Sequence, residues 1–319
     1  MPRRFPNDLP FGVIPAALMA FHDDFSMDEP SARKHLRDLA AVKGVQSLTV
    51  NGHASEVHAC TFEEQERILS FSLEEVGDRL PLVNGVYADG SLEAARIARM
   101  SAKAGAAALL VFPPQCLAMG GQLRPEMALS HFKTIADAAD LPLILFQYPL
   151  KSGLGYPWET LLALVEQVPS IRAIKDWCND PLLHERQTRV LQARPRPVNM
   201  LTTHSAWLLG SLVFGARGLL SGAGSVVADL QAALFAAVQA GDLPRAQGLH
   251  RRYHAIAELL YADPFLDMHN RMKTCLVLLG RLPSPVVRPP FQPLPAAEVE
   301  RLREGLARAG VGPEGARGI

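Results

Sequence analysis

The sequence predicts an α/β protein in which a TIM-type (β/α)8 barrel is followed by a C-terminal helical extension. Eight short segments rich in Val, Ile and Leu alternate with longer segments of helical period, as parallel strands covered by helices do. These units fill roughly the first 240 residues, close to the ~250 of a typical barrel, whereas open doubly wound sheets usually have fewer strands. The strand signal then disappears. We therefore predict the barrel over residues 1–226 and the helical region over residues 227–319.

Each predicted strand is an apolar run of strand length. Because parallel strands in such folds are covered on both faces, continuous apolar runs are expected in place of strict alternation. The eight runs are GVIPAAL from Gly12, VQSLTVNG from Val45, LPLVNGV from Leu80, AALLVFP from Ala107, PLILFQYP from Pro142, IRAIK from Ile171, VNMLT from Val198 and GLLSG from Gly218.

Amphipathic stretches separate the strands, and several carry recognisable ends. Thr61 followed by Glu64 predicts a capping box, and Gly105 follows LEAARIARMSAKA at the position of a C-cap. The predicted helices run over 27–41, 62–75, 92–104, 125–138, 158–168 and 182–191.

The region after Gly224 predicts further helices that a Pro-rich connector interrupts. Its final segment, VGPEGARGI, has little apolar content, and we expect a frayed tail there. The helical segments are VVADLQAALFAAVQAG, LPRAQGLHRRYHAIAELLY, HNRMKTCLVLLG and AAEVERLREGLARAG, and the connector is LPSPVVRPPFQPLP.

The charge balance excludes a general affinity for nucleic acid or for anionic membranes. Lys and Arg number 32, as do Asp and Glu, so the formal net charge is zero. No apolar run approaches the ~20 residues that span a bilayer, and the N-terminus lacks a signal-peptide core. The four cysteines form no CxxC pair, which indicates free thiols in a reducing compartment. We expect a cytoplasmic protein whose partners are small molecules or further copies of itself.

Lys175 closes the sixth predicted strand, at the end where such barrels carry their active sites. Alternation with Ala173 directs its side chain into the barrel. Burial there disfavours the ammonium form and lowers the pKa, and the free amine attacks a carbonyl to give an imine. The alternative is a structural lysine paired with Asp176 or another carboxylate. Position alone leaves both roles open.

Tyr148 closes the fifth predicted strand and shares a face with Phe146. Its phenol lies nearer the barrel mouth, where it could relay a proton. The alternative is an aromatic plug whose hydroxyl meets a backbone carbonyl. Both roles stay open at this point.

Two further loops at the predicted mouth suit anionic groups. The turn after the second strand presents backbone amides, His53 and Ser55 to a carboxylate, and Glu56 is expected to hold this loop through hydrogen bonds from amides. The run SGAGS at 221–225 suits a phosphate or is a packing device. The histidines at 22, 53, 58 and 204 belong to separate loops without metal-binding spacing, so we predict no metal site.

In order and spacing, these segments resemble the dihydrodipicolinate synthase and N-acetylneuraminate lyase family over nearly the whole chain. The resemblance implies an imine between Lys175 and a 2-oxo acid, usually pyruvate, and then carbon-carbon bond chemistry or loss of water through an enamine. It also implies a homotetramer, or dimer of dimers, with no cofactor and no metal. The matching segments are GVIPAALMAFHDDFSMD, GHASE for G-[ST]-T-G-E, FQYPLKSG for Y-N-x-P-x-R-x-G, AIKD for G-I-K-[DE], GLLSG for G-V-I-S, and VRPPFQPL for R-x-P-x-x-P-L. By position, the substrate-binding residues that it implies are His53, Ala54, Ser55, Phe146, Lys151, Leu220 and Gly222.

Several family residues are replaced. The proton-relaying tyrosine falls on Phe146, whose ring neither donates nor accepts a proton. The hydroxyl pair that binds the pyruvate carboxylate falls on His53 and Ala54, and the arginine after strand five falls on Lys151, a point charge in place of a bidentate fork. The tyrosine lent by a neighbouring subunit falls near Pro114 or Gln115, and neither residue replaces a phenol. These changes argue against dihydrodipicolinate synthase itself and against a standard sialic acid lyase.

Three functions remain open. The leading hypothesis is an aldolase or dehydratase for a 2-oxo acid, with Lys175 as nucleophile and Tyr148 or His53 as proton shuttle. The second is a catalytically impaired binding or regulatory protein on the same scaffold. The third is a barrel enzyme that binds a phosphorylated substrate through the SGAGS loop.

Overall fold

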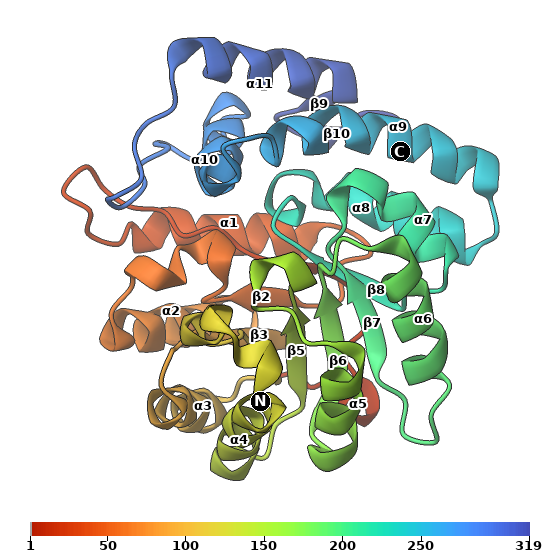
Figure 1. The fold of residues 1–319 in the computed structure, drawn as a ribbon. Coiled ribbons are helices and arrows are strands. Elements are labelled where there is room, and N and C mark those ends of the chain that lie inside the picture. The colour runs from red at the N-terminus through yellow and green to blue at the C-terminus, as the bar shows by residue number, and fades with distance from the viewer. Residues whose placement is uncertain (1) are drawn as a thin grey trace.

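Eight parallel strands form a barrel in the computed structural model, which describes residues 2–319 (Figure 1). Hydrogen-bonded neighbours follow the order β1-β8-β7-β6-β5-β4-β3-β2. Parallel bridges pair Val13 with Val45 and Ala16 with Thr49, and they bring β1 against β2. The predicted TIM barrel is therefore confirmed. The strands are β1 Gly12–Pro15, β2 Leu48–Val50, β3 Leu82–Val86, β4 Ala108–Val111, β5 Leu143–Gln147, β6 Ile171–Asp176, β7 Asn199–Thr202 and β8 Gly218–Ser221.

Helices follow the strands around the outside of the barrel. The capping box forms as predicted, because the Glu64 amide donates to Thr61 Oγ1 (3.2 Å) and the Thr61 amide donates to Glu64 Oε2 (2.9 Å). The short α7 has no counterpart among the predicted helices, since six residues are too few to show a helical period. The helices are α1 Glu29–Ala41, α2 Phe62–Val76, α3 Ser91–Ala104, α4 Pro125–Ala138, α5 Trp158–Gln167, α6 Pro181–Gln192, α7 Leu208–Val213 and α8 Gly224–Gln239.

Three more helices, α9 (Leu243–Leu260), α10 (Met268–Leu278) and α11 (Ala296–Ala309), gather beside α8 (Figure 1). Helix α9 packs between α8 and α11. The predicted division after residue 226 falls at a kink in α8, where Val227 leaves helical geometry, yet α8 continues beyond it and packs on β1. As a domain boundary, this division stays a prediction. Of residues 2–319, no helix combines the length and apolar character that crossing a membrane requires.

The prediction of a frayed C-terminal tail is wrong. Residues Val311–Gly312 (β9) and Gly315–Ala316 (β10) form a small antiparallel pair. The Arg281 guanidinium donates to Gly312 O (3.1 Å), and the amide of Ala316 donates to the Asp229 carboxylate on α8 (2.5 Å). The tail is thus held by polar contacts to the backbone, which a count of apolar residues does not detect.

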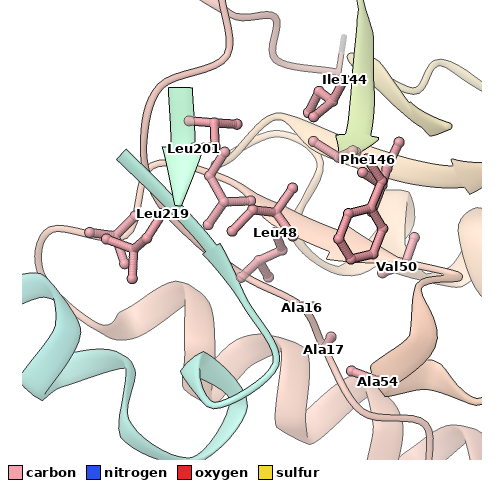
Figure 2. Close-up of a cluster of buried hydrophobic side chains, with 14 of the residues drawn as sticks. Ala16, Ala17, Leu48, Val50, Ala54, Ile144, Phe146, Leu201 and Leu219 are labelled. Carbon is pink, nitrogen blue, oxygen red and sulfur yellow. The ribbon is translucent and has the colours of Figure 1, made fainter. Parts of the chain in front are cut away.

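Buried apolar side chains fill the barrel interior and the layer between the strands and the surrounding helices. Figure 2 shows Leu48 and Val50 of β2 and Ile144 of β5 with Leu201 of β7 and Leu219 of β8. All five side chains are buried. This packed interior closes the barrel beneath the strand ends, so a ligand has access only from the mouth.

Candidate active site

The carboxyl ends of the strands open into a cavity of about 780 Å³. Its walls come from the loops after β2, β5, β6, β7 and β8 and from the segment that leads into α10. Six of the nine predicted site residues line it, namely His53, Ala54, Phe146, Tyr148, Lys175 and Gly222.

Lys175 lies in β6 between Phe146 of β5 and Leu201 of β7. Its Nζ is 4.1 Å from the centroid of the Phe146 ring, and only 6% of the residue is exposed. Burial lowers the pKa of Lys175 from 10.5 to about 7. Asp176, the partner that a structural lysine would need, instead lies 2.6 Å from His184 Nδ1. The amine is thus poised to lose its proton near neutral pH.

Tyr148 and His53 form a polar pair in the cavity wall. The Tyr148 hydroxyl lies 3.2 Å from His53 Nε2, and the Tyr148 ring is 4.5 Å from that of Phe146, centroid to centroid. Burial, reinforced by repulsion from neighbouring groups such as Lys175, holds the pKa of His53 well below 6.5, and burial raises the pKa of Tyr148. Both groups are therefore neutral at pH 7. A neutral imidazole can accept a proton that the phenol donates.

The other three predicted residues do not reach the cavity. The Ser55 hydroxyl donates to Ala17 O (2.8 Å), so it is occupied by the backbone. Lys151 is exposed in the turn after β5, and Leu220 is buried in β8 beside Ile14 of β1. None of the three lines the space above Lys175.

Glu56 joins the turn after β2 to the C-terminal region. Its carboxylate accepts a hydrogen bond from the Arg288 amide (2.9 Å) and pairs with Lys273 of α10, and both side chains of that pair are fully buried. The residue itself adopts the left-handed conformation, at φ 54°. These contacts support the predicted anchoring role, although an ion pair with α10 was not expected.

Much of the cavity wall was not predicted from the sequence. Trp177, two residues after Lys175 in the chain, could have been found by extending strand alternation beyond β6. No comparable pattern identifies the remaining residues, because they reach the cavity only through tertiary folding. They include Tyr261, Phe265, Met268, His269 and Met272 of the C-terminal region.

The SGAGS run makes internal contacts. The amide of Ala223 donates to the Tyr261 hydroxyl (3.1 Å), and the Ser225 hydroxyl donates to Ala16 O (2.6 Å). Gly222 lines the cavity, where an added Cβ would lie 3.1 Å from the Met272 methyl group. The run therefore packs against α10 and the segment before it, which weakens the phosphate hypothesis.

Asp176, Cys178 and His204 lie close together, with one potential ligand atom of each within 4.8 Å of the others. These atoms already have hydrogen-bond partners. Asp176 Oδ2 lies 2.6 Å from His184 Nδ1, and His204 Nε2 accepts from the Asn179 amide (3.1 Å). The expectation that the protein needs no metal stays a prediction.

Comparisons with known proteins agree with this architecture. The model of the dihydrodipicolinate synthetase family matches residues 9–309. The 4-hydroxy-tetrahydrodipicolinate synthase of Kineococcus radiotolerans is 32% identical over 309 residues, which cover 95% of each chain. That of Maridesulfovibrio salexigens is 26% identical over 300 residues, which cover 94% of this chain and 98% of the relative.

Solved structures share the fold over most of its length. YagE, a prophage protein of the dihydrodipicolinic acid synthase family from E. coli K12 solved in complex with pyruvate, superposes with a TM-score of 0.85 at 25% identity, over 94% of this chain and 98% of YagE. The dihydrodipicolinate synthase of Aquifex aeolicus superposes with a TM-score of 0.83 at 22% identity, over 94% of this chain and 98% of the Aquifex chain. The resemblance inferred from the motifs is confirmed. This chain belongs to the dihydrodipicolinate synthetase family, a family of pyruvate-dependent Schiff-base lyases and aldolases.

Proposed function

We propose that this chain is an aldolase or dehydratase that forms an imine between Lys175 and pyruvate or another 2-oxo acid. One observation carries the proposal. A buried amine with a pKa of about 7, which forms no ion pair with a carboxylate of the described residues, lies at the wall of a cavity of about 780 Å³. About half of such amines are uncharged at pH 7, and the uncharged form is the nucleophile.

In this proposal the Lys175 amine attacks the ketone carbon, and water leaves as the imine forms. The protonated imine withdraws electrons from the adjacent carbon, which then loses a proton to give an enamine. The enamine adds to an aldehyde or expels a β-hydroxyl group. The substrate carboxylate is placed at the backbone of the His53–Ser55 turn, because Ala54 lines the cavity and the Ser55 hydroxyl is occupied.

The Tyr148–His53 pair is proposed to move the protons that the family tyrosine moves elsewhere. Phe146 occupies that tyrosine's strand position, and Tyr148 lies next to it in the cavity wall. Because the pKa of Tyr148 is raised, its phenol stays protonated and acts as an acid. The neutral imidazole of His53 accepts the returning proton.

Reductive trapping tests the proposal. The full-length protein is incubated with pyruvate and borohydride, and the modified peptide is located by mass spectrometry. We expect a reduced pyruvate adduct on Lys175 that Lys175→Met abolishes and that Lys133→Met, on the exposed face of α4, retains. The absence of an adduct across a panel of 2-oxo acids, or an adduct on another lysine, would overturn it. The homotetramer implied by family likeness belongs to the same proposal and is tested by light scattering.

A further inference from the structure

We infer that the substrate group farthest from the imine is uncharged and aromatic, or similarly apolar and broad. This inference rests on the proposed function and concerns the same cavity. It specifies the aldehyde partner, or the tail of the 2-oxo acid, which must fit between Lys175 and the barrel mouth.

The first argument is the charge of the walls. Among the described residues that line the cavity, Lys175 is the only lysine or arginine, and no aspartate or glutamate is present. Three histidines line it, and burial lowers the pKa of His204 to about 4, that of His269 to about 3, and that of His53 well below its usual value. The walls are thus neutral at pH 7 apart from the amine that becomes the imine.

The second argument is a continuous row of aromatic rings that starts beside the amine. Phe146, whose ring contacts Lys175, is 4.5 Å from Tyr148, centroid to centroid. Tyr148 is 5.5 Å from Trp177, which stacks on Phe265 at 5.0 Å with an interplanar angle of 10°. Tyr261 extends the row at 6.0 Å from Phe265. Such a wall contacts a flat apolar group over a large area.

The third argument is size. A volume of about 780 Å³ falls within the roughly 300–1,000 Å³ of pockets that hold drug-sized ligands, and it exceeds what a three-carbon acid needs. A second carboxylate or a phosphate on the substrate would enter this space without a counter-charge, which is unfavourable. Lys151, which replaces the family's arginine, is exposed and off the cavity.

The reaction balances with an aryl aldehyde as partner. The pyruvate imine loses a methyl proton to the Tyr148–His53 pair and becomes an enamine. Its nucleophilic carbon bonds to the aldehyde carbon, and the aldehyde oxygen takes the proton back from the pair. Water then hydrolyses the new imine, which frees Lys175 and releases a 4-aryl-4-hydroxy-2-oxobutanoate.

Trapping of three 2-oxo acids tests the inference without requiring turnover. Pyruvate reports imine formation alone, 2-oxo-4-phenylbutanoate adds a neutral aryl tail, and 2-oxoadipate adds a charged tail of similar reach. The measured quantity is the concentration for half-maximal borohydride trapping on the full-length protein. We expect a value at least about tenfold lower for the aryl acid than for pyruvate, and a higher value for 2-oxoadipate.

Two variants sharpen the comparison. Phe265→Ala shortens the aromatic row and should reduce the advantage of the aryl acid over pyruvate. Leu266→Arg places a cation at the rim, where Leu266 is 56% exposed, and should favour 2-oxoadipate. If the parent protein traps pyruvate but traps 2-oxoadipate as well as or better than the aryl acid, the inference fails and the proposed function stands. If no acid is trapped, both fail.

Discussion

The pKa of Lys175 determines the pH range in which imine formation is fast. Since only the free amine attacks the ketone, the trapping rate with pyruvate should rise about tenfold per pH unit below pH 7 and level off above it. The measurement is the initial rate of adduct formation by intact mass between pH 5 and 9. A rate that still rises about tenfold per unit between pH 7 and pH 9 would show an ordinary, solvated lysine.

Burial of the same amine also destabilises the fold. The pKa is about 7 in the folded state and near 10.5 in the unfolded chain, so the unfolded state binds the proton more tightly at intermediate pH. The loss in the free energy of unfolding that burial of Lys175 causes is therefore fully present below about pH 7, and it disappears as the pH rises to 10.5. Lys175→Met should raise the unfolding free energy by about 2–5 kcal/mol at pH 7 and by much less at pH 10, measured by urea denaturation.

Tyr148 can be compared with Tyr156, a second buried tyrosine eight residues further along the chain. Tyr148→Phe should still form the trapped pyruvate adduct on Lys175. Its rate of aldol turnover, with pyruvate and an aldehyde as substrates, should fall by about 10²–10⁴-fold, the usual range for loss of a general acid. Tyr156→Phe is the matched control, since Tyr156 is equally buried and does not line the cavity. Equal turnover in the two variants would remove Tyr148 from the mechanism.

Strands and helices of the barrel could be predicted because their signals are local. The capping box at Thr61 and the apolar runs around β4 and β5 lie within a few residues in the chain. Lys175 was found for the same reason, since it directly follows such a run. Phe265 and the tail at 311–316 could not be found, because their partners are remote in sequence and pack on them only in the folded molecule.

The loop after β2 depends on an ion pair with α10. Both Glu56 and Lys273 are fully buried, so Glu56→Gln leaves an uncompensated ammonium and should cost about 3–5 kcal/mol in the free energy of unfolding. Glu300→Gln is the control, because its pair with Arg303 is exposed and should contribute at most about 1 kcal/mol. Urea denaturation at pH 7 compares the two. Equal losses would mean that the buried pair does not hold this loop in place.

At the scale of the molecule, the barrel and the C-terminal region together build one cavity. Lys175 comes from β6 and Tyr148 directly follows β5, whereas Phe265, His269 and Met272 come from the segment that ends in α10. The chemistry and the shape of the site thus have separate origins in the chain. This division explains why the nucleophile was predictable from strand pattern and the substrate class was not.

Because the barrel and the C-terminal region pack together around one cavity, we predict that the chain unfolds as one unit, even though the sequence predicts a domain boundary after residue 226. Trp177 stacks on Phe265 and Trp207 lies in a segment that contacts α9, so both are replaced by Phe, which leaves Trp158 of α5 to follow the barrel by fluorescence. Far-UV circular dichroism of the same variant also follows α9, α10 and α11. Because α8 packs on both β1 and α9, and Glu56 pairs with Lys273 across the two regions, the two urea transitions should coincide. A circular dichroism transition at lower urea than the fluorescence transition would show that the helical region melts first and that the cavity loses its C-terminal wall before the barrel opens.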